Sequence, residues 1–192
     1  MTIQTEQDII RLIENDEWMM NVLQMAKSLN LPDWWICAGF VRSKIWDTLH
    51  NYEAKTAMPD VDVIYYDSLH KDEIYEQSLE TKLMNIDATI PWSVKNQARM
   101  HVVNNMPPYS SSVDAISKFP ETATALGVTL GEEKNKVILT APCGIEDVLS
   151  LQVRPTDHFL ESKERLHMYN TRVTKKNWQN KWPNITITYP EI

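Results

Sequence analysis

The chain has 192 residues, a formal net charge of −7 at pH 7, seven tryptophans and two cysteines, Cys37 and Cys143. Its length allows one domain with a sizeable core. The negative charge argues against nucleic-acid binding over a broad surface, because such binding depends on clustered Lys and Arg. It does not exclude a local basic pocket. No apolar run approaches the roughly 18 residues of a membrane span, and no signal peptide is recognised. We therefore expect a cytoplasmic protein with reduced thiols, no disulfides and no membrane contact.

Helices and strands alternate in the first half of the chain. Residues 5–29 carry apolar side chains at helical spacing, begin with a capping pattern at Thr5 and Asp8, and divide near Asn15 and Asp16. An apolar run at 34–39 predicts a buried strand that ends in a glycine turn, and a helix follows at 40–50. Further along, the pattern predicts a strand at 61–66, a polar helix at 68–84 and another strand at 90–96.

The second half is predicted to be mainly helical. We expect a helix over 114–128 that is broken at Pro120, a short strand at 137–140 and a helix over 144–153. A basic amphipathic helix over 158–185 is expected to stop at Pro183, with Trp178 and Trp182 packing it onto the body. The prediction is a single α/β (α+β) domain over 1–192, with a core at about 25–105 and a helical extension at 106–192.

Two carboxylates stand close together at the start of the strand "VDVIYY". Asp60 and Asp62 are two residues apart, so on a strand they project from the same face, whereas Val61 and Val63 point to the opposite, buried face. At about 6.5 Å, two such charges repel by about 2.5 kcal/mol for an effective dielectric constant of 20. Solvent, a basic side chain or a divalent cation would make this arrangement tolerable, and Mg²⁺ favours such oxygen ligands.

The glycine turn at Gly39 gives the aspartates a context. A helix that starts at a glycine lets a ligand approach the backbone, and its free N–H groups and positive dipole end attract phosphate. A phosphate-binding turn beside a metal-binding pair is the combination that a nucleoside triphosphate with Mg²⁺ requires.

The strand, glycine turn and helix followed by Asp-x-Asp resemble the polymerase-β-like nucleotidyltransferase superfamily. "AGFVRSK" resembles the GGxVRD opening of tRNA nucleotidyltransferases and poly(A) polymerases, with Ala38 in place of the first Gly and Ser43 in place of the Asp. Five longer segments resemble a bacterial nucleotidyltransferase-like family: "LPDWWICAGFVRSKIWDTLH", "DVDVIYYD", "WSVKNQARMH", "PYSSSVDAISKFPETATALGV" and "APCGIEDVLSLQVRP". The resemblance covers about residues 25–185 and implies a mixed sheet of the nucleotidyltransferase fold.

This resemblance implies roles for five residues. Asp60 and Asp62 would be the catalytic metal ligands, holding up to two Mg²⁺ ions for which Mn²⁺ can substitute. Ala38, Gly39 and Arg42 would face the triphosphate.

A third carboxylate is implied on the strand at 92–96, where this chain has Ser93. Its candidate substitutes are Asp67, Asp87, Glu146 and Asp147.

The segment "KNQARMH" offers further polar contacts. If it is extended, Lys95, Gln97, Arg99 and His101 share one face. Such a stripe suits phosphate or base contacts, and it equally suits an exposed edge strand. Lys95 and Arg99 are the predicted nucleotide-binding residues, Arg99 above all because a guanidinium can grip a phosphate through two hydrogen bonds. The charges of "TKKNWQNKW" are read as a solvated helix face, with contact to an acceptor's phosphate as the alternative.

The leading interpretation is an enzyme that moves a nucleoside monophosphate from an NTP with Mg²⁺ to an unidentified acceptor and releases pyrophosphate. The acceptor, a small molecule, RNA or protein, stays open. A second interpretation is a nucleotide-binding module with little turnover that acts through a protein partner, which Ser93 favours. A third is a plain structural role in which the aspartates are merely solvated.

Overall fold

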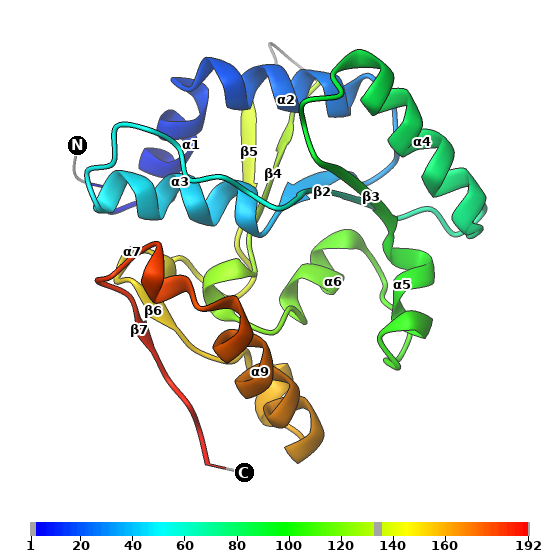
Figure 1. Cartoon of the computed structure of the whole chain (residues 1–192). Helices are drawn as coiled ribbons and strands as arrows, with labels where there is room; N and C mark the ends of the chain where they lie inside the picture. The colour runs from blue at the N-terminus through cyan, green and yellow to red at the C-terminus, as the bar shows by residue number, and fades with distance from the viewer. Residues whose placement is uncertain (1–2, 133–135, 192) are drawn as a thin grey trace.

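The centre of the molecule is a mixed five-stranded sheet in the order β3-β2-β1-β4-β5 (Figure 1). The structure is a computed structural model and describes residues 3–132 and 136–191. In the sheet, β2 and β3 are parallel and the other neighbouring strands are antiparallel. Its strands are β1 (Trp35–Cys37), β2 (Val61–Tyr65), β3 (Trp92–Asn96), β4 (Gly127–Leu130) and β5 (Val137–Thr140). The predicted α/β class, a mixed sheet flanked by helices, is confirmed.

The N-terminal region forms two helices, α1 (Glu6–Glu14) and α2 (Glu17–Lys27), divided where the sequence predicts. Thr5 and Asp8 form the expected capping box, and the Asp16 side chain accepts a hydrogen bond from the Met19 N–H at 3.0 Å, which starts the second helix. These helices contact β5 and β4, and α4 (Glu73–Ile86) contacts β3 and α2, so the three helices lie over one face of the sheet.

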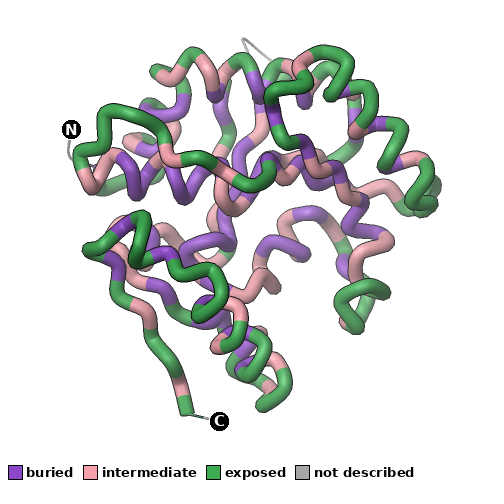
Figure 2. The backbone as a smooth tube through the Cα atoms, viewed as in Figure 1, coloured by how far each residue is buried: buried purple, intermediate pink, exposed green. Residues whose placement is uncertain are grey.

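Two clusters of apolar side chains lie on opposite faces of β1 and β2. Ile36, Val61 and Val63 belong to the large core, which also takes in α1, α2 and α3 (Gly39–Leu49). Cys37 and Ile64 belong to a small cluster with Ile116 and Ala125. Asp62 alternates with Val63 and therefore lies on the face of the small cluster, which the second half of the chain covers (Figure 2).

Several predictions for the second half are wrong. The expected helix over 114–128 is α6 (Ser112–Ser117), the 3₁₀ turn η1 (Thr122–Thr124) and β4. Gly127 pairs with Cys37 of β1. A Cβ on Gly127 would lie only 3.3 Å from the Cys37 Cβ, so the close approach of the two strands favours glycine at this position. Only α7 (Glu146–Leu149) is helical within 144–153, and β6 (Gln152–Val153) follows and pairs with β7 (Thr186–Ile187).

The expected long C-terminal helix is likewise divided. It forms α8 (Asp157–Leu160), α9 (Lys163–Lys176) and the 3₁₀ turn η2 (Trp178–Asn180). The Ser162 side chain caps the N-terminus of α9, and Asn177, with φ +45° and ψ +47°, ends it before Pro183 is reached. The expected packing of the two tryptophans is confirmed, because Trp178 and Trp182 are 4% and 2% exposed.

Two further findings bear on the sequence-based expectations. Cys37 is buried, Cys143 is half-buried, and both are free thiols. Across the described residues, no helix is both long and apolar enough to span a membrane.

Candidate functional site

Asp60 and Asp62 project from one face of β2 into a cavity of about 180 Å³. Asp60 precedes the strand and is exposed, whereas Asp62 lies within it and is half-buried. Val61 and Val63 are fully buried on the other face, as a two-residue period requires. Both carboxylates therefore face one hollow.

The environment of Asp62 disfavours a negative charge. Burial and the neighbouring charge of Asp60 raise the pKa of Asp62 to about 6, against a hydrogen bond from Ser93 and the positive charges of Lys176 and Arg172, which lower it. Ser93 is the residue of β3 directly opposite Asp62 in the parallel pair. A cation beside the two carboxylates would offset both the burial and the repulsion.

The turn between β1 and α3 forms another wall of this cavity. Ala38 has φ +54° and ψ −115°, a backbone conformation that costs a non-glycine residue about 1–3 kcal/mol. Gly39 begins α3, and the nearest described atom to a Cβ built on it is the Arg42 Nη2 at 3.7 Å, so no described residue excludes a side chain there. The open space lies at the N-terminus of an eleven-residue helix, where free N–H groups favour an anion.

Arg42 lines the same cavity and has no carboxylate partner among the described residues. It is 7% exposed, its Nε has no hydrogen-bond partner there, and its guanidinium lies over the rings of Trp178, Trp46 and Trp182 at 4.3, 5.1 and 5.6 Å from their centroids. Burial lowers the pKa of Arg42 to about 10, which leaves the group charged at neutral pH. A buried cation held by aromatic faces can accept an anionic ligand.

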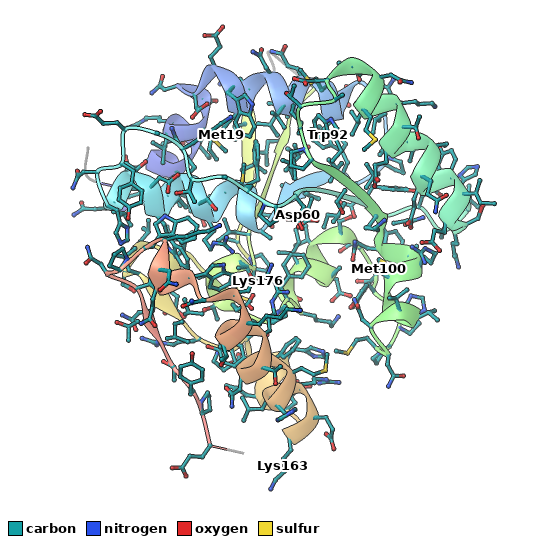
Figure 3. The ribbon with its side chains drawn as sticks, viewed as in Figure 1. Met19, Asp60, Trp92, Met100, Lys163 and Lys176 are labelled. Atoms are coloured by element: carbon teal, nitrogen blue, oxygen red, sulfur yellow. The ribbon has the colours of Figure 1, made fainter. Side chains whose placement is uncertain are left out.

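Three more cations enter the cavity from the C-terminal region: Arg172, Lys176 and Lys181. Arg172 is fixed by the fully buried Glu121, whose Oε1 accepts a hydrogen bond from the Arg172 Nε at 2.6 Å. Figure 3 shows Lys176 of α9 and Asp60 close together in the view, although they come from opposite halves of the chain. The lysines of "TKKNWQNKW" are exposed, as expected for a solvated helix face. Two of them, Lys176 and Lys181, also line the cavity.

Sequence reasoning did not single out Arg172. Arg172 lies four residues before Lys176, so both lie on one helix face. This spacing is the sequence feature that could have identified Arg172 as a site residue. Their meeting with the aspartates depends on long-range contacts. One long-range contact of the C-terminal region is the hydrogen bond that Asp47 of α3 accepts from the Trp182 Nε1 at 2.7 Å.

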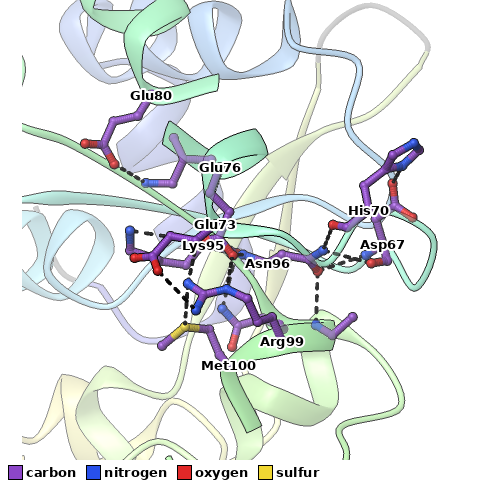
Figure 4. Close-up of polar contacts among 12 residues, drawn as sticks. Asp67, His70, Glu73, Glu76, Glu80, Lys95, Asn96, Arg99 and Met100 are labelled. Atoms are coloured by element: carbon purple, nitrogen blue, oxygen red, sulfur yellow. Dashed lines mark hydrogen bonds and ion pairs between the residues drawn. The ribbon is translucent and has the colours of Figure 1, made fainter. Parts of the chain in front are cut away.

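Lys95 and Arg99 are not among the residues that line this cavity. The condition that "KNQARMH" is extended holds only as far as Asn96, because the residues after β3 form the helix α5 (Gln97–Val103), which the Asn96 side chain starts. The fully buried Glu76 accepts hydrogen bonds from Arg99 at 3.0 and 2.7 Å, and the Lys95 Nζ is 4.0 Å from it (Figure 4). These two cations neutralise a buried carboxylate between α4 and β3.

Among the residues that the structure describes, no third carboxylate joins Asp60 and Asp62. Within the described ranges, no group of three His, Cys, Asp or Glu side chains is arranged to hold a metal ion. Three of the four expected substitutes have other contacts: Asp67 with His70, Asp87 with Thr89, and Asp147 with Thr122. Glu146 is likewise not among the cavity-lining residues.

The family is decided by comparison with known proteins. A family model described as nucleotidyltransferase matches residues 24–187. The chain belongs to this nucleotidyltransferase family. A solved structure reported as a CCA-adding enzyme head domain is 39% identical to this nucleotidyltransferase, covers 98% of each chain and superimposes with a TM-score of 0.88. No curated protein matches the sequence.

Complete CCA-adding enzymes share the fold at lower identity. One in complex with CTP is 12% identical, with a TM-score of 0.58 over 98% of this chain and 44% of that one. The Thermotoga maritima enzyme complexed with tRNA is also 12% identical, with a TM-score of 0.56 over 94% of this chain and 42% of that one. This nucleotidyltransferase therefore spans less than half the length of those enzymes.

Proposed function

We propose that this nucleotidyltransferase binds a nucleoside triphosphate together with Mg²⁺ in the cavity between β2, α3 and α9. It transfers the nucleoside monophosphate to an acceptor hydroxyl or phosphate and releases pyrophosphate. The observation that carries this proposal is the meeting of two carboxylates, a helix N-terminus and four cationic side chains around one hollow. A triphosphate would supply the negative charge that Arg42 and this helix end do not find among the described residues.

The donor set fits a divalent ion that arrives with its substrate. Mg²⁺ usually takes one or two protein carboxylates and completes its coordination with water and substrate phosphates. Asp60 and Asp62 would hold it, and Mn²⁺ is expected to replace it. When bound, the ion supplies charge neutralisation at the phosphates.

The protein's own groups account for binding and for charge. Arg42, Arg172, Lys176 and Lys181 would orient the β- and γ-phosphates and stabilise the charge that develops on pyrophosphate as its bond to the α-phosphorus breaks. The acceptor oxygen forms its bond to the same phosphorus, and an acceptor hydroxyl passes its proton to solvent water, whereas an ionised acceptor phosphate has none to lose. Catalysis in such transfers is mainly positioning and electrostatic stabilisation.

A nucleotide-binding module with little turnover is the second candidate. Ser93 favours it, because this residue lies opposite Asp62 where the family resemblance implies a third carboxylate. A protein with only two carboxylates can hold the nucleotide without activating an acceptor efficiently.

One pair of experiments separates these candidates. Melting temperature is measured with ATP, CTP, GTP and UTP, each with Mg²⁺ or with EDTA, and both candidates predict stabilisation only when nucleotide and metal are present together. Label transfer from α-³²P-labelled NTP to tRNA, to small alcohols and sugars, and to the protein itself then tests turnover. Stabilisation by nucleotide without any transfer or pyrophosphate release supports the binding module. Stabilisation by nucleotide that is the same in EDTA as in Mg²⁺ contradicts the proposed metal site.

A further inference from the structure

A second cavity, of about 280 Å³, adjoins the first one. Ala38, Asp62 and Arg172 line both cavities, so they form the wall between them. The second cavity extends from this wall toward residues of α5, α8 and α9, on the face of β2 that carries Asp62.

The two cavities differ in chemistry. Away from the shared wall, the charged side chains that line the first cavity are Arg42, Lys176, Lys181 and Asp60. Aromatic and apolar side chains dominate the second, among them Tyr109, Phe119, Phe159 and Met168. Tyr109 and Phe159 are about 5% and 4% exposed, Phe119 is half-buried, and Met168 is 55% exposed at the rim. Buried rings with a more open ring and a methionine at the entrance can accommodate a flat apolar group.

Polar groups in the second cavity are placed to select such a ligand. Gln97 and Asn104 both line it. Their amide nitrogens donate to the Lys95 carbonyl and the Tyr109 hydroxyl, at 3.4 and 3.2 Å, and their amide oxygens accept no hydrogen bond from the described part of the chain. Two acceptors among aromatic side chains match the N–H edge of a nucleobase.

The first cavity does not offer a comparable place for a base, although two tryptophans line it. The ring of Trp178 is covered by the Arg42 guanidinium at 4.3 Å. Trp182 packs against Trp46 at 5.2 Å and donates its N–H to Asp47. Both rings are almost fully buried, so neither has a free face for stacking.

We propose that the second cavity binds the nucleoside of the triphosphate, with the base between Phe119 and the rim at Met168 and with the α-phosphate at the shared wall of Asp62 and Arg172. This inference rests on the proposed function, since it assumes that the phosphates occupy the first cavity. The nucleoside is bonded to the α-phosphate, so it must extend out of the phosphate cavity at the wall where the α-phosphate lies. The second cavity begins at that wall.

The test compares the affinity of the full-length protein for two kinds of ligand. Inorganic tripolyphosphate carries the phosphates alone, whereas ATP, CTP, GTP and UTP add the nucleoside, and all are titrated calorimetrically in Mg²⁺. Phe119→Leu removes the ring and keeps an apolar side chain, and Met168→Ala shortens the rim. Met84→Ala is the matched control, because Met84 is a similarly exposed methionine, 47%, on α4 and lines neither cavity.

The proposal predicts that Phe119→Leu raises the Kd of the best-bound NTP by about tenfold, the scale of losing a base–aromatic stack. Met168→Ala is expected to raise it severalfold, and neither variant changes the Kd of tripolyphosphate. Met84→Ala leaves both affinities unchanged. Melting temperatures identify any variant that fails to fold, and Met168→Ala, at an exposed position, then decides the test.

Three results would overturn this assignment. NTP affinity that is unchanged in both variants places the nucleoside elsewhere, and if label transfer falls at the same time, the cavity belongs to the acceptor. An equal loss for NTP and tripolyphosphate means that the variants act through the phosphate cavity. If wild-type protein binds neither ligand in a metal-dependent way, the proposed function itself fails.

Discussion

Replacing Asp62 by Asn should make the metal-free protein more stable, and the gain should depend on pH. Burial and Asp60 raise the pKa of Asp62 from its ordinary 3.8 to about 6. A difference of about two pH units, at about 1.4 kcal/mol each, corresponds to about 3 kcal/mol of destabilisation by the ionised carboxylate. Asn carries no charge and has nearly the same size and shape as Asp.

The sign of this effect follows from linkage. Because the folded-state pKa is raised, the folded protein holds the Asp62 proton more tightly than the unfolded chain does. Wild-type stability should therefore fall relative to Asp62→Asn as pH rises from about 4 to about 6, and the full difference of about 3 kcal/mol remains above pH 6.

Urea unfolding of wild type and Asp62→Asn in EDTA at pH 4, 5, 6 and 7.5 measures this difference. Asp60→Asn is the comparison variant: it removes an exposed carboxylate and should give a smaller gain, through relief of repulsion alone. If Asp62→Asn is less stable than wild type at pH 7.5, or if its gain is the same at every pH, the description of a strained, buried carboxylate is wrong.

Three other substitutions test separate parts of the site. Ala38→Gly should stabilise the protein by about 1 kcal/mol in urea unfolding, because relief of the strained turn exceeds the added entropy of the unfolded chain; a loss of stability would contradict the strain. Gly39→Ala should leave unfolding unchanged within about 0.5 kcal/mol, yet raise the calorimetric Kd for tripolyphosphate about tenfold or more, since only a bound phosphate would compete with the new methyl group. Glu121→Gln should cost about 1–3 kcal/mol of stability and weaken tripolyphosphate binding, because Arg172 loses its buried partner; unchanged binding would remove Arg172 from the phosphate site.

Local patterns predicted the half of the site that is close in sequence. Alternation along β2 placed Asp60 and Asp62 on one face, and the strand–glycine–helix pattern placed the turn at Gly39 beside them. Both depend on the geometry of a few neighbouring residues. The helix starts at Thr5 and Asp16 were predictable for the same reason, since each cap satisfies N–H groups only two or three residues away.

The other half of the site depends on long-range contacts that no local pattern encodes. Arg172 and Lys176 line one cavity with Asp60 and Asp62, which lie more than a hundred residues earlier, and the partner that holds Arg172 is Glu121, in a turn between α6 and β4. The segment of β4 was predicted to be helical from its local pattern. It forms a strand because its pairing with β1 outweighs local propensity. The pairing of Arg99 with the buried Glu76, which lies on α4 23 residues earlier in the chain, is another contact that the local pattern does not show.

The central claim is that one divalent ion and one triphosphate share the cavity at Asp60 and Asp62. A crystal structure with Mn²⁺ and a non-hydrolysable NTP tests it most directly. We predict an anomalous Mn²⁺ peak in contact with both carboxylates and with phosphate oxygens, and the outer phosphates in contact with Arg42 and Lys176. A Mn²⁺ ion that contacts neither aspartate, or a triphosphate bound outside this cavity, would contradict the account.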